Sequence, residues 1–221
     1  MLLVTAFEPF GAWDHNPTVD VAAGVVAEIP DARTVTLPVD LGAAPNLLRA
    51  HLRDASAVLL LGLHGRARAV RVERVAINVA DFRIADNAGR TVRSAPLVPG
   101  APEGLLTTVD VRAVVDGIRD LDVPADVSNS AGTYLCNAAY YVALHDAPAR
   151  PCLFVHLPPL PGTAADAAER LQAMRDAGDV PAGPPSHLTG EDGGIDSNAG
   201  LALDAQVRAA LLCARHLLEV A

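Results

Sequence analysis

Cys136 is the residue whose surroundings best suit nucleophilic chemistry. It lies in the stretch SNSAGTYLCN (128–137), where a short strand leads through a Ser/Asn/Gly turn into an apolar helix. This context predicts Cys136 in the first helical turn, where unpaired N–H groups and the positive end of the helix dipole favour a thiolate. The same N–H groups are candidates for an oxyanion hole. A buried structural thiol is the alternative, and the local sequence alone favours it.

His156 is the candidate base for such a nucleophile. It ends the apolar run CLFVH (152–156). Binding and catalytic sites of α/β proteins lie at the carboxyl ends of such buried strands. Its imidazole could take the thiol proton and later return it to a leaving amine. A histidine bonded to a backbone carbonyl at a strand end explains this segment equally well.

Glu73 is the candidate for the group that orients the histidine. It lies in the strand-like segment VRVERV (70–75), where a carboxylate pointing into a partly buried space could fix the imidazole. Taken alone, however, the segment favours an exposed carboxylate paired with Arg71 or Arg74.

Other chemistry has little support in the sequence. His15 and His64 lie near strand ends and could line a pocket, but no HxxxH or HxH spacing suggests a metal site. Neither GxxxxGK[ST] nor GxGxxG is present, so no motif supports nucleotide binding. The sequence therefore predicts no metal site and no bound nucleotide.

Composition limits the class of protein. The chain has 221 residues, 51% of them hydrophobic and 19% charged, which is ordinary for a compact domain. The net charge is −9 and all 17 basic residues are arginines without a basic stripe, so a nucleic-acid partner is not expected. No apolar run is long enough to span a membrane, and the first residues suggest a strand rather than a signal peptide. Three scattered cysteines suit a reducing cytoplasm.

The elements that must position these residues alternate between strands and helices. Apolar runs predict strands at 2–7, 33–39, 57–63, 125–128 and 152–157. Helical patterns are found at 18–29, 45–55, 109–121, 133–145, 164–174 and 201–220. This alternation predicts an α/β fold with helices on both faces of a mostly parallel sheet.

Two segments depart from that alternation. Residues 70–79 alternate as one half-buried strand, and residues 82–98 are rich in turns. Residues 158–198 are rich in Pro, Gly, Ala and Asp, which predicts a long surface loop around the short helix at 164–174.

Five ordered stretches resemble the pyroglutamyl peptidase I family of cysteine peptidases, also called pyrrolidone-carboxylate peptidases. They are VTAFEPFG, ERVAINVADFRIADNAGR, PLVPGAP, SNSAGTYLCN and FVHLP. The resemblance implies a catalytic triad of Glu73, Cys136 and His156. It also implies a single-domain α/β/α sandwich over residues 1–221, a cytoplasmic location, no cofactor and a homotetramer.

The resemblance further implies a site for the flat pyroglutamyl lactam. Phe7 and Phe10 would sandwich the ring, burying its two faces. Backbone groups near Leu63 and Leu135 would bond the lactam N–H and C=O, and Arg83 would lie close to the cysteine and support the oxyanion. The buried polar pairing would reject proline, which has no lactam carbonyl.

The departures from the family pattern fall around this pocket. Ala6 and Ala12 replace two glycines of the family, and His64-Gly65-Arg66 follows a buried strand where the family has small residues. Residues 162–198 have no clear family counterpart, which indicates a long loop insertion that could cover the site or alter subunit contacts.

The leading hypothesis is hydrolysis of the amide bond after an N-terminal pyroglutamyl residue, with pyroglutamylated peptides as substrates. One alternative is a thiol peptidase or amidase of the same fold that acts on a different small N-terminal group. Another is a catalytically silent binding protein that retains the pocket.

Overall fold

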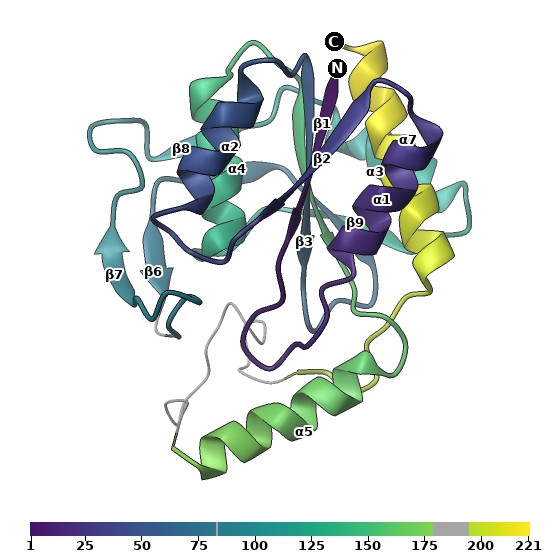
Figure 1. Ribbon diagram of the computed structural model, residues 1–221. Helices are drawn as coiled ribbons and strands as arrows, with labels where there is room; N and C mark the ends of the chain where they lie inside the picture. Colours follow the sequence, from purple (N-terminus) through teal and green to yellow (C-terminus); the bar gives the residue numbers. More distant parts are fainter. Residues whose placement is uncertain (83, 179–194) are drawn as a thin grey trace.

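A six-stranded sheet with helices on both faces forms the centre of the computed structural model, which describes residues 1–82, 84–178 and 195–221 (Figure 1). The strand order is β2-β1-β3-β10-β4-β9, and every neighbouring pair is parallel except β10 and β4. The strands are β1 (Leu2–Phe7), β2 (Ala32–Leu37), β3 (Ala57–Leu63), β4 (Val70–Glu73), β9 (Ala125–Ser128) and β10 (Cys152–Leu157). The predicted mostly parallel α/β sheet is therefore confirmed.

Helices on the two faces bury two separate cores. One face carries α1 (Thr18–Glu28), α3 (Val111–Arg119) and α7 (Leu203–Glu219), and the other carries α2 (Ala44–Leu52) and α4 (Leu135–Asp146). Because side chains alternate along a strand, β3 sends Leu59 and Leu61 into the first core and Val58 and Leu60 into the second. The central strands are apolar on both faces, as expected for buried parallel strands.

The segment predicted as one strand at 70–79 is two strands in two different sheets. β4 ends at Glu73 in the main sheet, and β5 (Val75–Ile77) pairs instead with β8 (Gly104–Leu106). The turn-rich region also contains a hairpin of β6 (Ala80–Phe82) and β7 (Val92–Ala95). These strands are three or four residues long, too short for their periodicity to stand out in the sequence.

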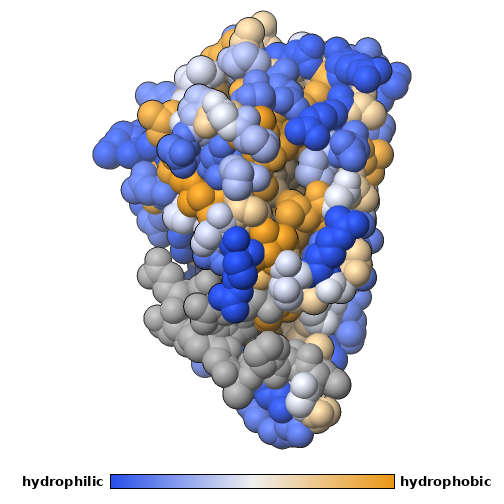
Figure 2. All heavy atoms as spheres, turned by 90° about the vertical axis from the view of Figure 1, so that its left-hand side faces the viewer, coloured by the Kyte–Doolittle hydropathy of each residue, from blue (hydrophilic) through white to orange (hydrophobic). Residues whose placement is uncertain are grey.

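The two small sheets, β5–β8 and β6–β7, lie on the α4 side of the main sheet. Figure 2 shows apolar side chains gathered in the middle of this side of the molecule, flanked by hydrophilic residues. Leu106 of β8 is 65% exposed, a large exposed fraction for a leucine.

The helix predicted at 164–174 is confirmed as α5 (Thr163–Asp176). Figure 1 shows α5 across the end of the sheet at which β1 and β3 finish. Most of the predicted loop after it falls at 179–194, outside the described residues. Among the described residues, no helix is long and apolar enough to cross a membrane.

Candidate active site

Strand register places the candidate residues in two adjacent rows on the α4 face of the sheet. His156 of β10 lies directly between Gly62 of β3 and Arg71 of β4. Phe154 lies opposite Glu73 in the next row. Because residues two apart share a face of a strand, all five positions project to the same side. The order of the strands thus brings His156 and Glu73 together although they are 83 residues apart.

Glu73 and His156 form a buried hydrogen-bonded pair. His156 Nδ1 lies 2.8 Å from Glu73 Oε1, and the exposed fractions of the two residues are 5% and 0%. The expectation of an exposed Glu73, favoured by its own segment, is therefore wrong, because β4 lies inside the sheet, between β10 and β9. Since an ionised carboxylate only accepts, His156 donates its Nδ1–H and leaves Nε2 free. The Tyr140 hydroxyl further fixes the Glu73 backbone by donating to its carbonyl at 3.0 Å.

Cys136 enters the site from the first turn of α4. The helix begins at Leu135, two residues later than predicted, and its first backbone bond runs from Ala138 N–H to Tyr134 C=O at 3.0 Å. The N–H groups of Leu135, Cys136 and Asn137 precede this bond, so the helix itself supplies them with no acceptor. The thiol is partly exposed and lies close enough to His156 to raise the pKa of its imidazole.

The surroundings of His156 favour its charged form. Burial by itself lowers its pKa, but Cys136, through its charge and a hydrogen bond, and the hydrogen bond and charge of Glu73 together raise the pKa to about 9. An imidazolium beside Cys136 stabilises the thiolate in return. Cys152 and Cys213 differ, because complete burial raises the pKa of each thiol. They stay protonated at neutral pH.

Gly62 makes room for the nucleophile. A Cβ at this position would lie 3.0 Å from Cys136 Sγ and 2.7 Å from the Phe154 ring. The contact with Phe154 is closer than real Cβ atoms make and the contact with Cys136 is tighter than most, so the strand needs glycine here for α4 to approach the sheet. Gly62 was not among the site residues expected from the sequence, although a glycine inside the apolar run AVLLLGL is the usual signal of such an approach.

Asn137 and Thr133 fix the start of α4. The buried Asn137 amide accepts from Ile77 N–H at 2.9 Å and donates to the carbonyls of Ile77 and Val79 at 2.8 and 3.0 Å. The Thr133 hydroxyl donates to Asp81 C=O at 2.6 Å. These bonds tie the turn before Cys136 to the β5–β6 segment, which accounts for a buried asparagine immediately after the cysteine.

His64 lies against the site, as its position near a strand end suggested. Its ring makes an edge-to-face contact with His156, with centroids 5.7 Å apart. Burial, followed by the charges of His156 and Arg71, lowers the pKa of His64 to about 3. His64 is therefore a neutral neighbour of the candidate base.

The aromatic residues expected to hold the lactam occupy different environments. Phe10 is partly buried and lies 6.3 Å from Tyr134, the residue that precedes α4, between ring centroids. Phe7 is 2% exposed within the core, so it offers little surface to a ligand. The Leu63 and Leu135 side chains are buried too, so only their backbone groups are available for polar contacts. Arg83 lies outside the described residues.

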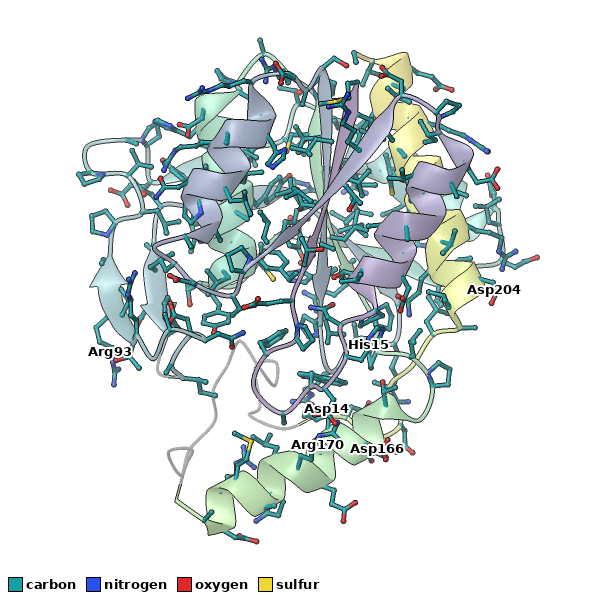
Figure 3. The ribbon with its side chains drawn as sticks, viewed as in Figure 1. Asp14, His15, Arg93, Asp166, Arg170 and Asp204 are labelled. Carbon is teal, nitrogen blue, oxygen red and sulfur yellow. The ribbon has the colours of Figure 1, made fainter. Side chains whose placement is uncertain are left out.

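Contacts from α5 hold the loop that carries Phe10. Arg170 of α5 donates from Nε to Ala12 C=O at 2.8 Å and pairs through Nη1 with Asp14 at 3.0 Å. Figure 3 shows Arg170 and Asp14 side by side. Trp13 is 4% exposed and shares an apolar cluster with Leu63 and the first turns of α5. Helix α5 therefore supports one rim of the site.

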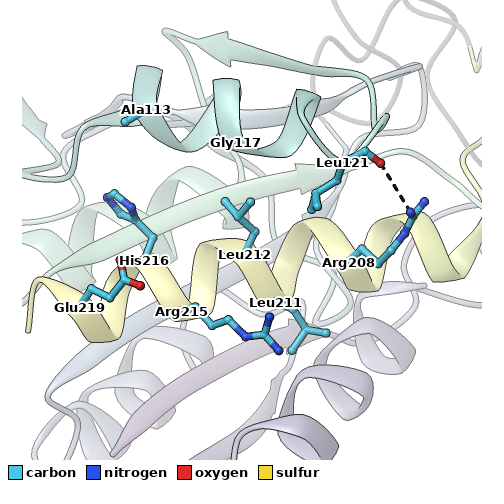
Figure 4. Close-up of a pocket in the computed structure, with 9 residues that line it drawn as sticks. All are labelled: Ala113, Gly117, Leu121, Arg208, Leu211, Leu212, Arg215, His216 and Glu219. Atoms are coloured by element: carbon cyan, nitrogen blue, oxygen red, sulfur yellow. Dashed lines mark hydrogen bonds between the residues drawn. The ribbon is translucent and has the colours of Figure 1, made fainter.

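A separate groove lies on the opposite face of the sheet. It is a cavity of about 550 Å³ between α3 and α7, and Figure 4 shows Arg208 bonded to the Leu121 carbonyl at its edge. None of the candidate catalytic residues lines it. Its leucine side chains and scattered charges form no catalytic arrangement. Within the described part of the chain, no three His, Cys, Asp or Glu residues cluster as metal ligands.

Comparisons with known proteins agree with this geometry. The pyroglutamyl peptidase family model matches residues 1–177. The pyrrolidone-carboxylate peptidase of Deinococcus radiodurans is 39% identical over 199 residues, covering 85% of this chain and 88% of the relative. That of Pyrococcus furiosus is 36% identical over 169 residues, covering 72% and 81%. The crystal structure of the Thermus thermophilus pyrrolidone carboxyl peptidase superposes with a TM-score of 0.77 at 34% identity, covering 98% of this chain and 100% of the other. The chain belongs to the pyroglutamyl peptidase family.

Proposed function

We propose that this chain is a cysteine peptidase that hydrolyses the amide bond after an N-terminal pyroglutamyl residue and releases pyroglutamate. The observation that carries the proposal is the linked set of Cys136, His156 and Glu73 on one face of the sheet. Membership of the pyroglutamyl peptidase family supports the same activity.

Each member of the set has one task. Cys136 Sγ, as a thiolate beside the His156 imidazolium, attacks the pyroglutamyl carbonyl carbon. The oxygen of the tetrahedral intermediate carries the negative charge, and the unpaired N–H groups at the start of α4 stabilise it. Glu73 accepts the Nδ1–H of His156 and keeps Nε2 directed to the reacting atoms.

His156 acts as a general acid in the first half of the reaction and as a general base in the second half. His156 Nε2–H first protonates the leaving amine as the C–N bond breaks, which leaves a thioester on Cys136. A water molecule then attacks the thioester carbonyl, and His156 takes a proton from it. The C–S bond breaks, pyroglutamate leaves, and the thiolate–imidazolium pair is restored. Proton and charge balance without a metal or cofactor.

Substrate contacts follow from the same placement. We propose that Phe10, Phe7 and the backbone of Leu63 and Leu135 form the lactam site, with Phe10 the main aromatic contact because Phe7 is almost fully buried. Arg83 keeps its proposed role near the oxyanion on sequence grounds alone. A flat lactam suits a site that combines aromatic faces with a few backbone polar groups.

We also propose a single domain over residues 1–221, since both cores pack on one sheet. Because the family model extends through residue 177, we place any insertion relative to the family after α5. A homotetramer is supported by Leu106 of β8, which is 65% exposed, and by the apolar side chains gathered on the same side in Figure 2. A cytoplasmic location is supported by three free cysteines.

Turnover of a pyroglutamyl 7-amino-4-methylcoumarin amide tests the proposal. We expect activity in the wild type, loss of activity in Cys136→Ala, and retained activity in Cys213→Ala, which removes a buried thiol on the other face. No turnover by the folded wild type, or full activity in Cys136→Ala, would overturn it.

A parallel panel of pyroglutamyl, prolyl and glutaminyl amides tests the substrate class. His64 beside His156 is the observation that makes a different small N-terminal group the second candidate. A preference for the pyroglutamyl amide supports the proposed substrate. A preference for either other amide supports the alternative.

A further inference from the structure

Arg71 occupies a particular place beside the candidate triad. It is the cross-strand partner of His156 in the β4–β10 pair and lies two residues before Glu73 on the same face of β4. Its Nη2 donates to Ser128 Oγ at 2.9 Å, and its Nε lies 4.0 Å from Glu73 Oε1. The guanidinium is therefore held by the neighbouring strand at ion-pair distance from the triad carboxylate.

Two polar atoms in this arrangement lack hydrogen-bond partners among the described residues. Arg71 Nε and Glu73 Oε2 are both buried, although 37% of the Arg71 side chain is exposed. A buried carboxylate is costly unless an opposite charge compensates it, and a buried guanidinium nitrogen is costly for the same reason. The closeness of the two groups offsets both costs, because each supplies the charge that the other needs.

The charges of the site balance only when Arg71 is included. With a neutral thiol and a neutral His156, Glu73 carries one negative charge and Arg71 one positive charge. After the proton moves from Cys136 Sγ to His156 Nε2, the thiolate and the imidazolium form a second compensated pair. The buried group stays neutral overall before and after proton transfer.

We propose that Arg71 is a positioning residue for the reaction: it offsets the charge of the Glu73 carboxylate, so that this carboxylate holds His156 in place while the proton moves. This inference rests on the proposed peptidase function. Arg71 does not touch the substrate in this account, so its loss should slow the chemical step and leave substrate binding unchanged.

The test compares Arg71→Met with Arg71→Lys in the full chain. For pyroglutamyl-coumarin amide we expect kcat to fall about tenfold in Arg71→Met with KM unchanged, because the carboxylate loses a partly screened neighbouring charge. Arg71→Lys, which keeps the charge, should recover most of the lost kcat. Arg49→Met is the matched control, since Arg49 pairs with Asp146 at 2.7 Å at the far end of α4 and has a similar exposed fraction of 41%. Its kcat should equal that of the wild type.

Alkylation of Cys136 by iodoacetamide supplies a reading that needs no substrate. At neutral pH it should be slower in Arg71→Met than in the wild type and restored in Arg71→Lys. Unchanged kcat and alkylation in Arg71→Met, or no recovery in Arg71→Lys, would overturn the inference. A wild type that is alkylated rapidly but does not turn over the pyroglutamyl amide would contradict the proposed substrate, and the alkylation series would still decide the role of Arg71.

Discussion

The two sides of the active site are built in different ways. Glu73 and His156 lie on neighbouring strands of the central sheet, and their contact follows from backbone register. Phe10 lies on the loop after β1, and contacts with other elements, including α5 through Arg170, hold that loop. One side is set by the sheet and the other by side-chain contacts at its edge.

This difference separates chemistry from recognition. Strand register changes only by whole residues, and a slip of one residue would send Glu73 to the opposite face. A loop held by a few side chains can shift by fractions of an ångström. We therefore expect changes on the sheet to act on kcat, and changes at the α5 rim to act on KM.

The largest expected effect comes from removing the triad carboxylate. Glu73→Gln should lower kcat about 10²–10⁴-fold, because the amide can donate to His156 and stabilise the wrong tautomer. Glu28→Gln, at the exposed end of α1, is the control and should leave kcat unchanged. Steady-state kinetics on the pyroglutamyl amide measure both. An unaffected kcat in Glu73→Gln would remove the carboxylate from the mechanism.

A smaller effect is expected from crowding the nucleophile. Gly62→Ala should lower kcat roughly 10- to 100-fold, since a Cβ 3.0 Å from Cys136 Sγ displaces the thiol from its place beside His156. Gly24→Ala is a matched control, because its Cβ would lie 2.9 Å from Val207 on the other face of the sheet.

Both glycine variants should lose about 1–3 kcal/mol of unfolding free energy through overpacking. Chemical denaturation measures this loss of stability. Steady-state kinetics measure whether kcat falls in Gly62→Ala alone. If Gly24→Ala lost as much kcat as Gly62→Ala, general destabilisation would explain both.

A substitution at the α5 rim should change KM and not kcat. Arg170→Met removes the hydrogen bond to Ala12 and the ion pair with Asp14, and we expect KM to rise roughly 3- to 10-fold with kcat unchanged. Arg208→Met on α7 removes a weaker pair, with Asp204 at 3.9 Å, and should change neither constant. A fall in kcat in Arg170→Met without a change in KM would contradict the separation of the two sides.

The smallest expected effect is a shift in pH dependence. His156 must be protonated to donate to the leaving amine, so activity should decline as pH rises through its pKa of about 9. Because Glu73 raises that pKa, the residual activity of Glu73→Gln should decline at a lower pH than that of the wild type. A profile of kcat/KM against pH measures the shift. A decline at the same pH in both proteins would mean that Glu73 does not stabilise the imidazolium.

The sheet side of the site was the more predictable from sequence. Long apolar runs such as Ala57–Leu63 are strands because both faces are buried, and the family motifs placed Glu73, Cys136 and His156 in order. The strand order was not predictable, since the antiparallel β4–β10 pair depends on contacts far apart in the chain. For that reason the local sequence gave Glu73 an exposed position.

The rim was less predictable because its contacts are between side chains of distant segments. Nothing in the sequence around Arg170 indicates that it bonds the Ala12 carbonyl, 158 residues away. The short strands β6 to β8 were missed, and β5 was merged with β4, for a related reason, since pairs such as Val75 and Leu106 carry no periodic pattern of their own. Gly62, by contrast, was predictable, because a glycine inside an apolar strand indicates that another segment approaches closely there.

The reactivity of Cys136 tests the central claim most directly. Iodoacetamide labelling at several pH values, followed by peptide mapping, compares Cys136 with Cys152 and Cys213 in one sample. We predict that Cys136 is labelled first, and rapidly at pH values well below the ordinary thiol pKa of about 8.5, with the advantage lost in His156→Ala. Labelling of Cys136 no faster than that of the two buried cysteines would contradict the account.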